Sequence, residues 1–172
     1  MKELVPYLLP VLSTMAFAIV LTILFLRQEN KKRRHELRLK EGLELMRLRF
    51  QAYERLLLLL ERLKPEALVL REQKQGLTTL QFQTLLLKIV RQEFDHNIAM
   101  QLYVDDKTWT RVKAAKEALV KLINTTASGI DNKASALELS RQIIEGAGGE
   151  TILYFNNAIA AIRDEMNNLY GK

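Results

Sequence analysis

Residues 5–26 read VPYLLPVLSTMAFAIVLTILFL, and residues 27–40 continue as RQENKKRRHELRLK. The first stretch has 22 residues without a charge. As a helix rising about 1.5 Å per residue it reaches roughly 33 Å, close to the thickness of the hydrocarbon core of a bilayer. A cleaved signal peptide has a shorter apolar core and small residues at its exit, whereas this stretch ends in LFL and is followed by Arg27. We therefore expect residues 1–26 to form a retained, single-pass transmembrane anchor.

The positive charge of the chain is concentrated directly after this apolar stretch. Residues 27–50 hold nine Lys or Arg against four Asp or Glu, whereas residues 51–172 hold 16 against 15. Basic residues beside a span stay on the cytoplasmic side, so we expect the amino terminus to lie outside and the remaining chain to lie in the cytoplasm. The residues expected to contact anionic lipid headgroups are Arg27, Lys31, Lys32, Arg33, Arg34, Arg38 and Lys40.

Two features of the sequence bear on self-association. Thr14, Ala18 and Thr22 form two overlapping small-xxx-small steps, a pattern that lets transmembrane helices approach closely, and they are the candidate transmembrane packing face. Further along, apolar residues follow a heptad spacing. The members of this seam are Leu39, Leu43, Met46, Phe50, Tyr53, Leu57 and Leu60. The seam over residues 39–60 either pairs with a second copy, giving a homo-oligomer, or packs within its own chain, and the sequence leaves both open.

The absence of proline between Arg27 and Lys64 lets the helix continue from the membrane. We predict a basic juxtamembrane helical stalk over residues 27–49 and a cytoplasmic helical bundle over residues 50–172. Pro65 is expected to end the long helix and to begin a short one, because a proline fits the first helical position and disfavours helical geometry in the residue before it.

The remaining helices are placed by start and stop signals. Residues 78–81 read TTLQ and fit a capping box, and Asp105 or Asp106 is expected to cap the next helix. The polar residues 124–132 predict a loop. The predicted helices cover residues 65–72, 78–102, 105–124, 133–145 and 152–169. Since no segment alternates as a strand does, the fold class is all-α: a transmembrane helix that continues into a stalk, followed by a bundle of about five to six helices.

The sequence offers few residues for catalysis. It has no cysteine and two histidines, which excludes a thiolate metal site and a cysteine nucleophile. Glu93 and His96 form a Glu-x-x-His step like those of di-iron bundles, but the other histidine, His35, lies beside the predicted membrane, so a second such step cannot be assembled. We keep a membrane-tethered metal-binding or hydrolytic protein that uses Glu93 and His96 only as an alternative. We expect no catalytic residue, no metal site and no cofactor.

Several local stretches resemble a family of uncharacterised bacterial single-pass membrane proteins, a domain of unknown function. They are residues 50–55 (FQAYER), 60–62 (LER) with Pro65 after them, 93–97 (EFDHN) and 101–104 (QLYV). The resemblance implies a location in the bacterial inner membrane, with an amino-terminal anchor and a helical cytoplasmic domain. It implies no activity or cofactor. Within these stretches Tyr53, Arg55, Glu93 and His96 form a candidate polar network, which either serves function or fixes the register of the bundle.

The function expected from these observations is that of a non-enzymatic, membrane-anchored interaction or scaffold module, an accessory component of a membrane-associated assembly. Its expected partners are membrane lipids and another protein or a second copy of itself. A net charge of +6 and an isoelectric point near 9.6 are also typical of proteins that bind nucleic acid. Binding of nucleic acid through the basic juxtamembrane segment is therefore a further alternative, which we disfavour because anionic lipid accounts for the same charges.

Overall fold

The computed structural model describes the backbone of residues 5–170 and the side chains of residues 15, 17–34 and 37–169. Its first helix, α1, covers Val5–Leu63. The chain divides into two compact units, an amino-terminal unit over Met1–Arg47 and a carboxy-terminal unit over Leu48–Lys172. The predicted stalk, residues 27–49, is helical throughout.

The predicted transmembrane helix is not found in the described part of the chain. Among the described residues, no helix combines the length and the apolar character needed to cross a bilayer. Eleven residues of the predicted span, 5–14 and 16, lie outside the part whose side chains are described. Thr14 of the candidate packing face is one of them.

The carboxy-terminal unit consists of the end of α1 and five further α-helices. They are α2 (Pro65–Glu72), α3 (Thr79–Asn97), α4 (Asp106–Ser128), α5 (Ala136–Ala147) and α6 (Glu150–Tyr170), with a 3₁₀ helix, η1 (Ile98–Leu102), between α3 and α4. No strand occurs between residues 5 and 170, where the only extended pairing is an isolated bridge between Thr78 and Ser135. The all-α prediction is confirmed.

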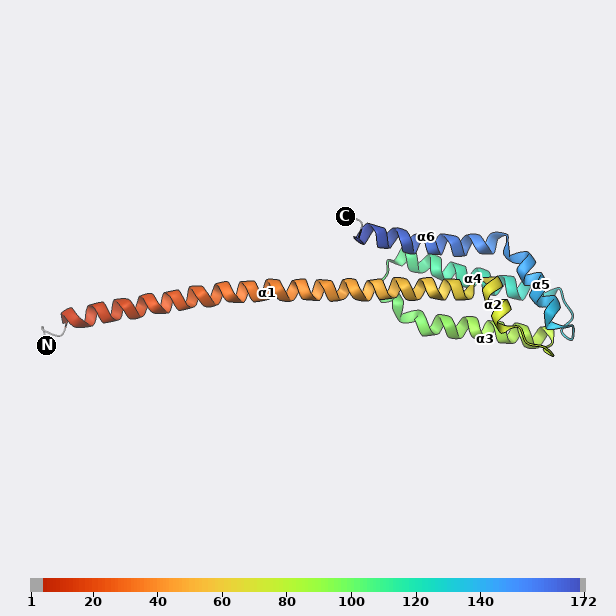
Figure 1. Ribbon diagram of the computed structural model, residues 1–172, viewed down its shortest axis with the longest axis horizontal. Helices are drawn as coiled ribbons and strands as arrows, with labels where there is room; N and C mark the ends of the chain where they lie inside the picture. Colours follow the sequence, from red (N-terminus) through yellow and green to blue (C-terminus); the bar gives the residue numbers. More distant parts are fainter. Residues whose placement is uncertain (1–4, 171–172) are drawn as a thin grey trace. The chain divides into compact units, whose positions relative to one another are not determined.

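The helices of this unit share one hydrophobic core. Helix α4 packs against α3, α5 and α6, and α2 packs against α5 (Figure 1). The end of α1 contributes a full set of buried side chains to the same core. These are Ala52, Tyr53, Leu56, Leu59, Leu60 and Leu63. The later part of the predicted seam, over residues 53–60, therefore packs within its own chain.

Two start signals read from the sequence are confirmed. Gln81 N donates to Thr78 Oγ1 at 3.3 Å and Gln81 Oε1 accepts from Thr78 N at 3.0 Å, which is a complete capping box. Pro65 is the first residue of α2, and α1 ends two residues before it, at Leu63. Asp105 is the N-cap residue of α4, but its side chain makes no capping hydrogen bond there.

Helix α3 ends earlier than predicted. The prediction extended it to residue 102, whereas it ends at Asn97 and continues as the 3₁₀ helix η1. Asn97 Nδ2 donates to the carbonyl oxygen of Glu93 at 2.8 Å. A side chain that bonds to the backbone in this way competes with regular helical pairing, and the following turn tightens.

The predicted loop over residues 124–132 was wrong in its first half, because α4 continues to Ser128. Ile123 and Ala127 are both buried and lie four residues apart on the core-facing side of the helix. Their burial outweighs the low helix propensity of the intervening threonines. Helix α5 starts at Ala136 rather than at residue 133, since the side chain of Ser135 caps it by accepting from Leu137 N.

Candidate functional site

A buried carboxylate joins three segments of the carboxy-terminal unit. Glu165 of α6 is 7% exposed, and its Oε1 accepts hydrogen bonds from Arg49 Nη2 at 3.0 Å, Tyr53 Oη at 2.9 Å and Asp105 N at 3.0 Å. Arg49 Nε also donates to the carbonyl oxygen of Tyr103 at 3.0 Å. We call these residues the Glu165 cluster. It ties the end of α1 and the start of α4 to α6.

The electrostatics of the cluster favour a protonated Tyr53 phenol beside the ion pair of Arg49 and Glu165. Burial, and then the hydrogen bond to Glu165, raise the pKa of Tyr53 well above that of a free tyrosine. Tyr53 therefore remains a hydrogen-bond donor. Arg49 also lies 3.6 Å from the exposed Asp105 Oδ1. The second oxygen of Glu165, Oε2, is buried and has no hydrogen-bond partner among the described residues.

The four residues of the predicted polar network do not form one network. Tyr53 belongs to the Glu165 cluster, whereas Arg55 and His96 are exposed. Glu93 pairs with both Arg62 Nε, at 3.0 Å, and Arg62 Nη2. In the part of the chain with described side chains, no hydrogen bond joins any two of the four. Arg55 follows Tyr53 by two residues, about 200° around the helix, so the two side chains leave on opposite sides.

Glu93 and His96 are poorly placed to coordinate a metal ion. The carboxylate of Glu93 is engaged by Arg62, which links α3 to α1. Within the described residues, no group of three or more His, Cys, Asp or Glu side chains is arranged to hold a metal ion.

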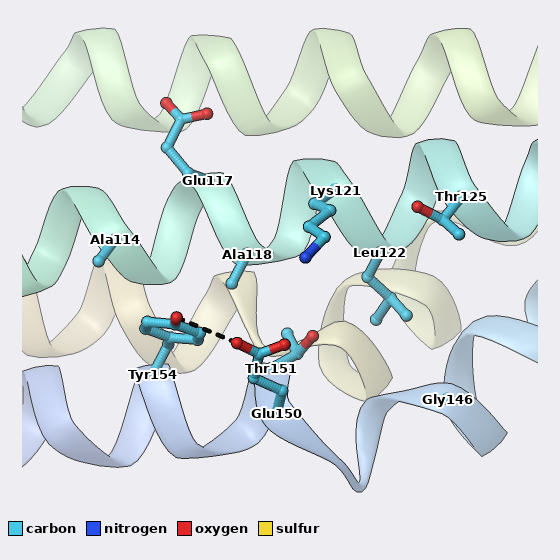
Figure 2. A pocket seen from close by; sticks show the side chains of 10 residues that line it. All are labelled: Ala114, Glu117, Ala118, Lys121, Leu122, Thr125, Gly146, Glu150, Thr151 and Tyr154. Atoms are coloured by element: carbon cyan, nitrogen blue, oxygen red, sulfur yellow. Dashed lines mark hydrogen bonds between the residues drawn. The ribbon is translucent and has the colours of Figure 1, made fainter.

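A separate pocket of about 450 Å³ lies between α4 and α6 in the carboxy-terminal unit (Figure 2). Small residues, Ala114 and Ala118 on α4, make up part of its wall. Figure 2 shows the ammonium group of Lys121 turned toward the pocket, opposite Thr151. Tyr154 Oη donates to Glu150 Oε1 at 3.1 Å on its rim. The pocket is open and mixes both charges, so it does not by itself define a ligand.

The described part of the predicted span is lined with exposed apolar side chains. Nine large apolar residues are exposed, and they are Met15, Phe17, Ile19, Val20, Leu21, Ile23, Leu24, Phe25 and Leu26. All seven predicted headgroup contacts, from Arg27 to Lys40, are exposed as well. In the candidate packing face, Ala18 and Thr22 are exposed, and Thr22 Oγ1 donates to the carbonyl oxygen of Ala18 at 2.8 Å. The hydroxyl of Thr22 is thereby satisfied within its own helix.

The model of a protein family described as a family of unknown function (DUF7935) matches residues 1–169. The chain belongs to this family. The match confirms the predicted membership of an uncharacterised family. No curated protein and no solved structure matches the chain. The DUF7935 match covers both structural units, so the apolar stretch and the helical bundle are parts of one family pattern.

Sequence reasoning missed two central members of the Glu165 cluster in this DUF7935 chain, Arg49 and Glu165. One signal was available for Glu165. It follows Phe155, Ala158 and Ile162 at spacings of three and four, on the stripe of α6 that is buried. A carboxylate on a buried helical stripe needs a hydrogen-bonding or cationic partner, but the position of Glu165 in the sequence does not identify that partner.

Proposed function

We propose that this protein is a non-enzymatic scaffold held at a membrane by the apolar start of α1, with its helical bundle free to bind another protein. The observation that carries the proposal is the row of nine exposed large apolar side chains ending at Leu26, followed directly by the cationic residues from Arg27 onward. Complete burial of such a side chain is worth about 1.5–3 kcal/mol. Nine of them in water are a large cost, which a bilayer removes.

The charge distribution supports one orientation of this anchor. Seven exposed Lys or Arg lie between Arg27 and Lys40, whereas Lys2 is the single basic residue before the apolar stretch. Each basic residue near an anionic leaflet contributes about 1 kcal/mol. The proposed arrangement is a single pass through the bacterial inner membrane, with the amino terminus outside and the bundle in the cytoplasm.

The carboxy-terminal unit suits the role of a binding platform. Its helices share one core, and the Glu165 cluster fixes α1 to α4 and α6. Confinement to a membrane raises the effective concentration of such a platform for other membrane-associated proteins. The activity proposed is therefore tethering, in which the bundle binds and the anchor localises.

Extraction of membranes with alkaline carbonate tests the anchor. We expect the full chain to remain in the membrane pellet. The variant Met15→Lys/Ile19→Lys is expected to move into the supernatant, because each charge near mid-span costs about 2.5–3.5 kcal/mol. The control Leu37→Lys/Leu45→Lys adds the same two charges at exposed positions beyond the span and is expected to stay in the pellet. Release of the unmodified chain by carbonate would refute the proposal.

A further inference from the structure

One stretch of α1 in the amino-terminal unit carries an apolar stripe bordered by cations. Leu39 and Leu43 are 55% and 66% exposed, and residues four apart lie on the same helix face. Because successive residues turn by about 100°, Lys40 and Arg47 lie along one border of these leucines, at about 60–80° from their midpoint. Both cations are exposed. We call Leu39, Lys40, Leu43 and Arg47 the basic-edged stripe.

The acidic residues of the same stretch lie on the other side of the helix. Glu41 and Glu44 are rotated by roughly 140–200° from Leu39. Glu44 lies 3.8 Å from Arg47, with both side chains more than 60% exposed, so this ion pair is weak and leaves Arg47 able to pair elsewhere. Both carboxylates therefore lie farther from the leucines than Lys40 and Arg47 do. The cations border the apolar stripe and make it complementary to an acidic, amphipathic surface.

A second copy of this chain does not supply that surface. Two copies anchored in one membrane would run parallel, which places Lys40 and Arg47 at e positions of the heptad, with Leu39 at d and Leu43 at a. Their cross-helix neighbours at g in the second copy would be His35 and Gly42. Neither is acidic, so a pair of identical chains leaves both border cations without a carboxylate.

Lipid headgroups also fail to account for the whole stripe. Arg47 follows Leu26 by 21 residues, or about 31 Å along a helix. Surface potentials decay over roughly 8 Å at physiological salt. The far end of the stripe therefore needs a partner other than the membrane.

We infer that the basic-edged stripe binds an amphipathic α-helix of a different protein, one with apolar residues at a and d and Asp or Glu at the flanking e and g positions. The inference deepens the proposed scaffold function and rests on it, because it names the chemistry of the partner that the tethered chain recruits. The leucines provide the apolar contact, and the border cations select acidic flanks over basic ones.

Two synthetic peptides of about three heptads test this inference. Both carry Leu at a and d; one carries Glu and the other Lys at every e and g position. Binding to the full chain in detergent micelles is followed by fluorescence anisotropy of a dye on each peptide. We expect the Glu peptide to bind at least about tenfold more tightly than the Lys peptide, and the variant Lys40→Glu/Arg47→Glu to reverse that preference.

Matched leucine variants distinguish binding at the stripe from non-specific hydrophobic binding of the peptide. Leu39→Ser/Leu43→Ser is expected to weaken binding of the Glu peptide at least about tenfold. Leu37→Ser/Leu45→Ser changes leucines that are similarly exposed, at 51% and 53%, but lie on the opposite face, and it is expected to leave binding unchanged. Equal binding of the two peptides, or full binding by Leu39→Ser/Leu43→Ser, would overturn the inference.

The chain has no cysteine, so Leu43→Cys gives a single thiol on the stripe. Under mild oxidation in the membrane we expect this variant to remain monomeric. Efficient disulfide formation between two copies would show that a second copy covers the stripe, and would overturn the inference in favour of self-pairing. Since the peptide assay is performed in detergent, its outcome does not depend on the carbonate test of the anchor, and the two proposals can fail separately.

Discussion

Replacement of Glu165 by alanine is expected to destabilise the bundle severely. The substitution removes the acceptor for Arg49 Nη2, Tyr53 Oη and Asp105 N at once. Removing one partner of a buried ion pair costs about 3–5 kcal/mol. Arg49 keeps a quarter of its side chain exposed, and solvent screens part of that loss, so we expect about 3 kcal/mol.

Trp109 reports this change directly. It is the single tryptophan of the chain, is buried, and stacks on Phe94 with ring centroids 5.3 Å apart. Its fluorescence follows urea or thermal unfolding of the full chain in detergent. For a unit of this size about 3 kcal/mol corresponds to a fall in Tm of roughly 10 °C.

The ion pair of Glu93 and Arg62 provides the control. The side chain of Arg62 is 53% exposed and that of Glu93 is 21% exposed, so solvent screens the pair and its contribution is about 1 kcal/mol. Glu93→Ala is therefore expected to lower Tm by only a few degrees. In Arg49→Met/Glu165→Leu both charges are replaced by apolar groups, and the loss should be smaller than in Glu165→Ala alone. A Glu165→Ala variant as stable as Glu93→Ala would refute the reasoning that the Glu165 cluster fixes α1 to the bundle.

Three further predictions concern single features. The pKa of Tyr53 is raised on folding, so its contribution is complete below pH of about 10, the pKa of an unfolded tyrosine, and is lost as pH rises further. Urea midpoints should therefore fall more steeply above that pH in the unmodified chain than in Tyr53→Phe, and parallel profiles would contradict this. Thr78→Ala breaks the capping box with Gln81 and should cost about 1 kcal/mol by urea titration, whereas no loss would mean that the cap is dispensable. Zinc or EDTA should leave Tm unchanged, and a rise with zinc that His96→Ala abolishes would instead support the metal-binding alternative.

Local signals in the sequence predicted local structure well. The capping box at Thr78 and the break at Pro65 depend on neighbouring residues, so they could be read before the fold was known. The end of α4 was misjudged because composition favoured a loop, whereas burial of Ala127 in the core extends the helix. That burial depends on tertiary packing, which overrides local propensity.

The Glu165 cluster illustrates what a single sequence does not reveal. Arg49 and Glu165 are 116 residues apart, and no short-range pattern relates them. Tyr53 was singled out, but its partner was sought at Glu93 and His96, which lie on α3. Only the packing of α1 against α6 and the start of α4 brings the three donors to one carboxylate oxygen.

Thiol labelling in intact cells tests the central claim, the anchored orientation, most directly. The chain lacks cysteine, so Glu3→Cys and Ser128→Cys each introduce a single thiol on either side of the proposed span. With a maleimide that does not cross the inner membrane, we predict that Glu3→Cys is labelled in intact spheroplasts and that Ser128→Cys is labelled only after lysis. Labelling of Ser128→Cys without lysis, or protection of Glu3→Cys, would contradict the account.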